Sequence, residues 1–153
     1  MREVRRTALI GQAPERMFAL INDIESYPQF LPWCTSAKVQ SSTEREIIAT
    51  IGVRRGALNA QFTTRNELTA NRHIAMRLVS GPFKTLEGDW TLTPVAAAGQ
   101  TGCRVDLHLR FAFANRLTGL IFEPLFEETA ISLVDAFVAR ARLLAPGTGD
   151  EHP

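Results

Sequence analysis

The residues whose spacing best suits proton transfer are Asp106 and His108, two positions apart in a segment of alternating apolar and polar residues. A carboxylate and an imidazole on one face of a strand can act as a general acid–base pair. Arg104 and Arg110 follow the same alternation and would share that face. We therefore expect a solvent-facing ladder of charges, paired across strands, rather than a catalytic pair.

Neither metal binding nor nucleophilic catalysis has a recognisable set of residues. His73, His108 and His152 each lack a second ligand at the spacing of a helical turn or a hairpin. Cys34 and Cys103 form neither a CxxC pair nor a disulfide framework, which favours a reducing cytoplasm. The sequence also lacks a GxSxG elbow and a glycine-rich loop that opens a helix. We expect a protein that is not an enzyme, with no metal and no catalytic cofactor.

The chain of 153 residues, 45% hydrophobic and 22% charged, has the size and composition of one globular domain. We predict a single domain over residues 1–145 and a polar, disordered tail over residues 146–153. No apolar run approaches the roughly 18 residues of a spanning helix, and the N-terminus does not match a secretory signal. The expected location is the cytoplasm, with peripheral contact at the inner face of the cell membrane as a further option.

Local signals predict one strand and two short helices in the first 33 residues. The strand covers residues 3–10 and ends at Gly11. Pro14 suits the first turn of a helix, where its missing N–H is not needed, and an apolar stripe extends this helix to about Asn22. Pro28 and Pro32 restrict the next segment to a short helical turn followed by a corner.

Strand periodicity dominates the middle of the chain. Apolar and polar residues alternate over 58–65, 73–78, 86–93 and 103–113. Turn signals lie at 52–56, 70–72, 81–82 and 99–102. We predict six strands in this part of the chain, joined by short links into an antiparallel sheet with one wet face.

The last segment, about 115–144, has helical periodicity. Its second half carries an apolar stripe that includes Phe126 and Phe137, and Arg140 and Arg142 complement the helix dipole at its end. The first half is apolar around more of its circumference than one core stripe needs, and Pro124 should kink or break the helix. The order of strand, two short helices, six strands and one long helix predicts an α+β fold.

One side of the predicted sheet is strongly apolar. These residues could form a filled core or line a pocket for an elongated apolar molecule, and the sequence leaves both alternatives open. The residues expected to point to this side are Phe62, Met76, Leu78, Leu86, Trp90, Leu109, Phe111 and Phe113.

The net charge of +1 hides an uneven distribution of charges. Between Arg116 and Arg140 the chain has only acidic charges, whereas the segment 54–84 is basic, with Glu67 as its one acidic residue. This asymmetry indicates either an anionic partner, such as phosphate or a lipid headgroup, or solvated strand faces. The basic residues of the segment are Arg54, Arg55, Arg65, Arg72, Arg77 and Lys84.

Several short blocks, in order along residues 3–144, resemble the coenzyme Q-binding START-like family of the polyketide cyclase and lipid-transfer superfamily. The first block is residues 23–34, DIESYPQFLPWC. The others are 62–65 (FTTR), 81–84 (GPFK) with Leu86, Gly88, Trp90 and Pro94, the strand at 107–113, and 134–137 (VDAF) with Arg140 and Ala141.

The resemblance implies a helix-grip fold, in which a curved antiparallel sheet wraps around the long C-terminal helix and leaves a hydrophobic tunnel. It also implies non-catalytic binding of ubiquinone or a similar isoprenoid lipid, in support of respiratory electron transport. Phe83 and Lys84 would lie on a loop near an opening. The expected tunnel residues are Tyr27, Phe30, Leu31, Trp33, Phe62, Met76, Leu78, Leu86, Trp90, Phe111, Phe113, Leu125 and Phe126. The candidate donors to a quinone headgroup are Tyr27, Trp33, Thr64, Asn66 and Trp90.

Bacterial members of this family are also described as ribosome-association toxins that bind the large subunit and block subunit joining. The expected contact surface is the same in both hypotheses: lipid headgroups in the first, ribosomal RNA phosphates in the second. It consists of Arg54, Arg55, Arg65, Arg77 and Lys84. We rank isoprenoid binding first, ribosome association second and small-molecule cyclisation a distant third, and we expect no DNA partner.

Overall fold

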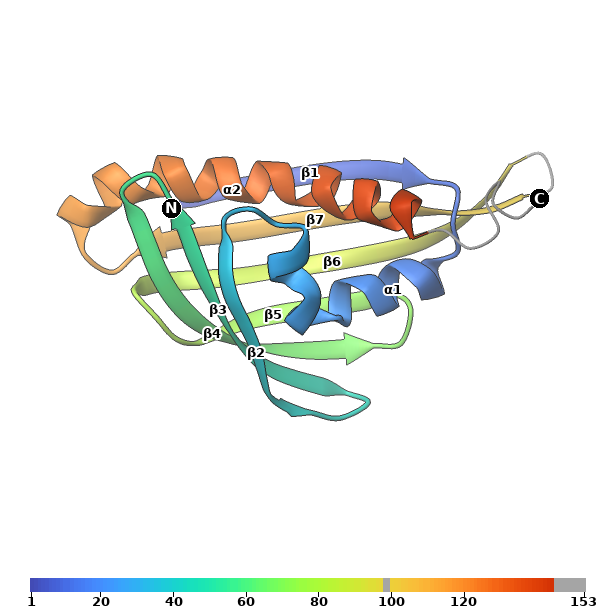
Figure 1. Cartoon of the computed structure of the whole chain (residues 1–153), viewed down its shortest axis with the longest axis horizontal. Helices are drawn as coiled ribbons and strands as arrows, with labels where there is room; N and C mark the ends of the chain where they lie inside the picture. Colours follow the sequence, from blue (N-terminus) through green and yellow to red (C-terminus); the bar gives the residue numbers. More distant parts are fainter. Residues whose placement is uncertain (98–99, 145–153) are drawn as a thin grey trace.

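The computed structural model describes residues 1–97 and 100–144, and it confirms the predicted order of elements (Figure 1). The predicted tail, with His152, lies outside the described residues. The first 33 residues form a strand, a helix and a short 3-10 helix, and six strands and a long helix follow. The elements are β1 (Arg2–Ile10), α1 (Pro14–Asn22), η1 (Ile24–Gln29), β2 (Cys34–Ser42), β3 (Glu46–Arg55), β4 (Leu58–Thr69), β5 (His73–Ser80), β6 (Phe83–Ala97), β7 (Gln100–Phe113) and α2 (Arg116–Leu143).

The seven strands form one antiparallel sheet in the order β1-β7-β6-β5-β4-β3-β2. The chain therefore runs as a meander from β2 to β7, and β1 joins the outer edge of β7, from Arg2 opposite Phe111 to Ile10 opposite Cys103. The sheet curves, and α2 lies along its concave side (Figure 1). This is the predicted helix-grip arrangement.

Two glycines predicted to lie in turns lie inside strands instead. Gly52 is in β3 opposite Ser36, where a Cβ atom would come within 2.5 Å of Thr35 Oγ1 and 2.7 Å of Ser36 Oγ. Gly52 therefore leaves room for two hydroxyl groups of the neighbouring strand rather than forming a turn. The turn itself uses Gly56, at φ +58°. Gly102 lies in β7, and residues 98–99 of the predicted turn lie outside the described part of the chain.

Helix α2 continues through Pro124, so the predicted break is wrong. Its start is fixed by the Asn115 side chain, which accepts hydrogen bonds from two backbone N–H groups of the first turn. Contacts on both sides of the proline hold the helix on the sheet. Glu123 accepts a hydrogen bond from the Phe113 backbone N–H at 3.0 Å, and Phe126 packs into the sheet. Anchoring on both sides offsets the one backbone hydrogen bond that a proline removes.

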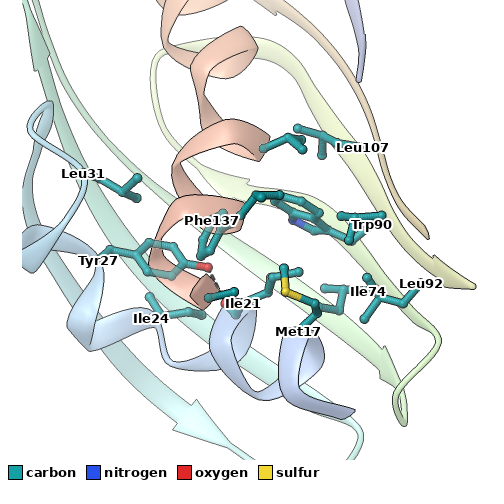
Figure 2. Close-up of a cluster of buried hydrophobic side chains, with 14 of the residues drawn as sticks. Met17, Ile21, Ile24, Tyr27, Leu31, Ile74, Trp90, Leu92, Leu107 and Phe137 are labelled. Atoms are coloured by element: carbon teal, nitrogen blue, oxygen red, sulfur yellow. Dashed lines mark hydrogen bonds between the residues drawn. The ribbon is translucent and has the colours of Figure 1, made fainter. Parts of the chain in front are cut away.

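The interior consists of two apolar clusters, and α2 contributes a phenylalanine to the centre of each. Phe137 lies between Tyr27 and Trp90, with ring centroids 5.3 and 5.4 Å away in edge-to-face contact (Figure 2). Phe126 makes the corresponding contacts in the other cluster, 4.8 Å from Phe111 and 5.1 Å from Phe83. Aromatic pairs of this geometry stabilise a core beyond the effect of area burial.

Tyr27 fixes the corner between α1 and the sheet. Its ring is buried, and its hydroxyl donates a hydrogen bond to the Ile21 carbonyl at the end of α1 (Figure 2). Burial raises the pKa of the Tyr27 hydroxyl far above its ordinary value. The hydroxyl thus serves the fold of the η1 corner and stays protonated there.

Replacing Phe137 by alanine should lower the free energy of unfolding by about 3–5 kcal/mol, because the change removes edge-to-face contacts and leaves a cavity. Urea denaturation measures this difference. Ile131→Ala is the matched control on the same helix, since Ile131 is partly exposed and should lose under about 1 kcal/mol. Equal losses in the two variants would contradict the central role of Phe137.

Tyr27 is the only tyrosine in the chain, so phenolate absorbance reports on it alone. The folded protein should show no phenolate near pH 10, where an exposed tyrosine is half ionised. Because the pKa is raised in the folded state, the stabilisation is complete below the unfolded-state pKa of about 10 and is lost as the pH rises above it. Phenolate absorbance and far-ultraviolet circular dichroism should therefore change together. Reversible ionisation of Tyr27 in the folded protein would contradict its burial.

Candidate functional site

A small apolar cavity lies between α2 and the concave face of the sheet, with a volume of about 90 Å³. It lies where the two core clusters meet, and Trp33, Ile51 and Met76 pack against both clusters. Phe126 and Phe137 bound it from α2. The interior is therefore neither completely filled nor an open tunnel of the size usual for ligand pockets, roughly 300–1,000 Å³.

Seven of the thirteen predicted tunnel residues line this cavity. They come from η1 and the corner after it, from three strands of the meander and from α2, and so from segments that are far apart in the sequence. They are Tyr27, Trp33, Phe62, Met76, Leu86, Trp90 and Phe126.

The structure places the other six predicted residues outside the lining. Phe111 and Phe113 belong to the cluster around Phe126, and Leu78 packs on the same cluster. Leu31 is fully buried in the other cluster. The two remaining residues lie against other partners: Leu125 against the Gly56 turn, and Phe30 against Phe137 and under the Arg140 guanidinium, 5.0 Å from the ring centroid.

The helical side of the lining follows one stripe of α2, which begins at Phe126 and ends at Phe137. Thr129, Ala130 and Leu133 lie between them on the same stripe and line the cavity. The prediction for α2 named only Phe126 and its neighbour Leu125. These residues follow Phe126 by three, four and seven positions and so lie on the same face of the helix. This spacing is the signal in the sequence that could have identified them.

Three buried polar side chains line the cavity, namely Thr64, Asn66 and Thr129. The Thr64 hydroxyl donates to Asn66 Oδ1 at 3.0 Å, which leaves the Asn66 amide NH₂ as a donor for a bound molecule. The Thr129 hydroxyl donates to the Leu125 carbonyl at 3.0 Å. Tyr27, a predicted donor, instead uses its hydroxyl proton on Ile21. The cavity thus combines apolar walls with one amide donor, which suits an apolar molecule that carries a carbonyl group.

The size of the cavity depends on the packing at Gly88 of β6. A Cβ atom at this position would lie 2.8 Å from both Met76 Cε and Leu109 Cδ1, so these side chains occupy the space that the glycine leaves. Methionine has three rotatable side-chain bonds and adapts readily to irregular spaces. Met76 is therefore the lining residue whose movement would enlarge the cavity most readily.

The convex face of the sheet carries the expected charge ladder. His108 pairs with Glu3, and Asp106 accepts hydrogen bonds from Thr7 at 2.6 Å and from Arg104. The hydrogen bond from His108 is the main cause that lowers the pKa of Glu3. Asp106 and His108 thus bind different residues of the neighbouring strand β1, as expected for cross-strand pairs.

Both cysteines are buried, and burial raises the pKa of the Cys34 and Cys103 thiols. A raised pKa disfavours the thiolate that nucleophilic catalysis needs. Among residues 1–97 and 100–144, no group of His, Cys, Asp and Glu side chains is placed to hold a metal ion. No helix in that part of the chain is long and apolar enough to cross a membrane.

The basic segment is partly neutralised by carboxylates from elsewhere in the chain. Arg55 pairs with Glu128 of α2 at 3.3 Å, and Arg65 pairs with Glu46 of β3 at 3.2 Å. The other three predicted contact residues lie at the surface: Arg77, whose guanidinium donates to the Met76 carbonyl at 2.8 Å, and Arg54 and Lys84, both exposed.

Phe83 does not lie on a loop near an opening, as was predicted for Phe83 and Lys84. It is buried as the first residue of β6, 4.6 Å from the Phe113 ring centroid. The turn consists of Gly81 and Pro82 alone. Only Lys84 of the predicted pair is therefore at the surface.

The acidic side of α2 is likewise paired, in this case with β1. Arg2 contacts Glu123 at 3.5 Å and also pairs with Glu127, while Arg6 contacts Asp135 at 3.4 Å. Three of the four acidic residues between Arg116 and Arg140 therefore form ion pairs that join α2 to the edge strand β1. Partly exposed pairs of this kind contribute little stability individually.

Comparisons with known proteins agree with this architecture. The chain is 44% identical to the ribosome association toxin RatA of Escherichia coli K12 over 142 residues, 93% of this chain and 88% of that protein. It is 23% identical to the mitochondrial coenzyme Q-binding protein COQ10 homolog B of Xenopus laevis, over 91% of this chain and 57% of that protein. The crystal structure of TTHA0849 from Thermus thermophilus has the same fold, with a TM-score of 0.81 at 21% identity, over 94% of this chain and 99% of that one.

A family model described as polyketide cyclase/dehydrase and lipid transport matches residues 10–138. The matched segment includes α1, the corner at η1, strands β2 to β7 and the part of α2 that lines the cavity. The chain belongs to this polyketide cyclase/dehydrase and lipid transport family.

Proposed function

We propose that this protein associates with the ribosome, in the manner that the name of its bacterial relatives describes. The observation that carries the proposal is the 44% identity to the Escherichia coli ribosome association toxin along nearly the whole length of both chains. The fold alone would not suffice, because one fold can host several unrelated functions. Identity at this level over the whole domain includes the surface as well as the core.

The basic residues on the convex face of the sheet are the proposed contacts with ribosomal RNA. Arg54 and Arg77 are exposed, and no carboxylate lies within 4.0 Å of either in the described parts of the chain. Contacts between guanidinium groups and phosphates release counterions and so depend on salt. Arg65 is a weaker candidate for contact with RNA, because its guanidinium already forms an ion pair with Glu46.

Charge reversal at Arg54 and Arg77 together should weaken binding to purified large subunits by about tenfold or more and lower the slope of log affinity against log salt by roughly two. Sedimentation with large subunits at several salt concentrations measures both quantities. The expected loss comes from two phosphate contacts, and circular dichroism checks that the variant is folded.

The matched control is charge reversal at Arg5 and Arg104, which changes the net charge by the same amount. These residues already pair with Glu3 and Asp106, so they should contribute less to ribosome binding. Equal weakening in both double variants would show a general effect of charge and would contradict a specific contact at Arg54 and Arg77. Absence of ribosome binding by the unmodified protein would overturn the proposed function itself.

The cavity supports a second candidate function, the non-catalytic binding of a small isoprenoid or quinone group. Its walls are apolar, Asn66 offers one donor, and no charged side chain lines it. A quinone ring needs more space than about 90 Å³, so binding would require Met76 and its neighbours to move. The ribosome would be the partner of this protein in the cytoplasm. An isoprenoid ligand would also bring the protein to the inner surface of the cell membrane.

The two tryptophans of the chain, Trp33 and Trp90, both line the cavity, so a bound quinone should quench their fluorescence. Titration with a short-chain ubiquinone should give saturable quenching. Ala130→Met should weaken binding by about tenfold, because the added atoms occupy the cavity. Ala139→Met is the matched control, since Ala139 is exposed on the same helix. Quenching that does not saturate, or that is equal in both variants, would exclude the cavity as the site.

A further inference from the structure

The first two turns of α2 expose an apolar surface that the packing of the domain does not use. Leu117, Leu120 and Ile121 are 75%, 77% and 59% exposed. Their spacing of three and four residues places them on one stripe of the helix. Side chains of this size seldom lie together in water on a monomeric protein unless they contact a partner. We call these three residues the apolar tip.

Two basic residues, Arg116 and Lys84, lie at the same end of the molecule as the apolar tip. Arg116 belongs to the same helical turn as Leu117. The Ala114 backbone N–H donates to the Pro82 carbonyl at 2.9 Å, which brings the β5–β6 turn, followed by Lys84, beside the start of α2. The β3–β4 turn lies at the same end of the molecule (Figure 1), and its Gly56 faces Leu125.

The acidic residue closest to the tip along the helix does not neutralise these charges. Glu123 accepts a hydrogen bond from the Phe113 backbone N–H and pairs with Arg2. Within residues 1–97 and 100–144, no carboxylate lies within 4.0 Å of the charged groups of Arg116 or Lys84. The end of the molecule therefore combines exposed aliphatic side chains with free positive charges.

We propose that this end of the molecule docks on the surface of an anionic lipid bilayer, with the apolar tip inserted among the acyl chains and Arg116 and Lys84 at the headgroups. The acyl chains complement the apolar tip, and the anionic headgroups complement the two basic residues. Transfer of aliphatic side chains out of water lowers the free energy, and each basic residue near an anionic surface adds to the attraction.

Two other partners fit this surface less well. Nucleic acid would attract Arg116 and Lys84 but offers no apolar environment for Leu117 and Leu120. A second copy of the chain, related by a two-fold axis, would bring the same positive charges of both copies together around the contact. Docking on a bilayer is independent of ribosome association, so an experiment that contradicts one proposal leaves the other intact.

Flotation with vesicles tests this proposal. The protein should bind vesicles that contain phosphatidylglycerol and phosphatidylcholine more strongly than vesicles of phosphatidylcholine alone. Leu120→Glu should weaken binding by about tenfold, because a charge replaces an inserted side chain. Arg116→Glu should weaken binding by about fivefold or more, and added salt should reduce this difference.

Leu143→Glu is the matched control, since Leu143 is a 74% exposed leucine near the other end of α2. It should bind vesicles like the unmodified protein. Equal binding of Leu120→Glu and Leu143→Glu would overturn the proposal, as would the absence of any preference for phosphatidylglycerol. A dimer in sedimentation velocity that Leu120→Glu dissociates would also overturn it, because the tip would then be an interface between copies of this chain.

Discussion

The structure depends on the packing of one stripe of α2 against the concave face of the sheet. Phe126 and Phe137 lie eleven residues apart on that stripe, about three helical turns, and each is the centre of an aromatic cluster. A single helix thereby holds two cores that different parts of the sheet supply. β1 adds Arg2 and Arg6, which pair with the acidic side of the helix.

The cavity follows directly from this arrangement. Between the two phenylalanines the cavity is lined from the helix by Thr129, Ala130 and Leu133, whose side chains are shorter than phenylalanine. On β4, which lies opposite, Thr64 and Asn66 stand in place of apolar residues, and the Thr64 hydroxyl donates a hydrogen bond to Asn66. Small and polar residues on both sides leave a space where two aromatic clusters meet. The same choice of residues makes the space a site with an available amide donor.

The sequence predicted the elements well because their signals are local. Alternation over strands such as 103–113, the proline at the start of α1 and the long apolar stripe all depend on neighbours within a few residues. Gly52 and Pro124 were misjudged because tertiary contacts decide them: a neighbouring strand that passes close to the glycine, and anchors on both sides of the proline. Likewise, Phe111 and Phe113 point inward as predicted, but whether an inward residue meets a neighbour or a cavity depends on distances across the fold.

The distribution of charge along the sequence predicted the available surface charges least well, because ion pairs join distant segments. Glu123, Glu127 and Asp135 belong to the purely acidic stretch between Arg116 and Arg140, yet β1 neutralises them, and Glu128 pairs with Arg55. Pairing within the domain therefore selects which charges remain for a partner. Among those that remain are Arg54 and Arg77 on the convex face and Arg116 and Lys84 at the end that carries the apolar tip. Because three large aliphatic side chains are exposed together at the tip, one domain can present a surface suited to phosphates and another suited to lipid.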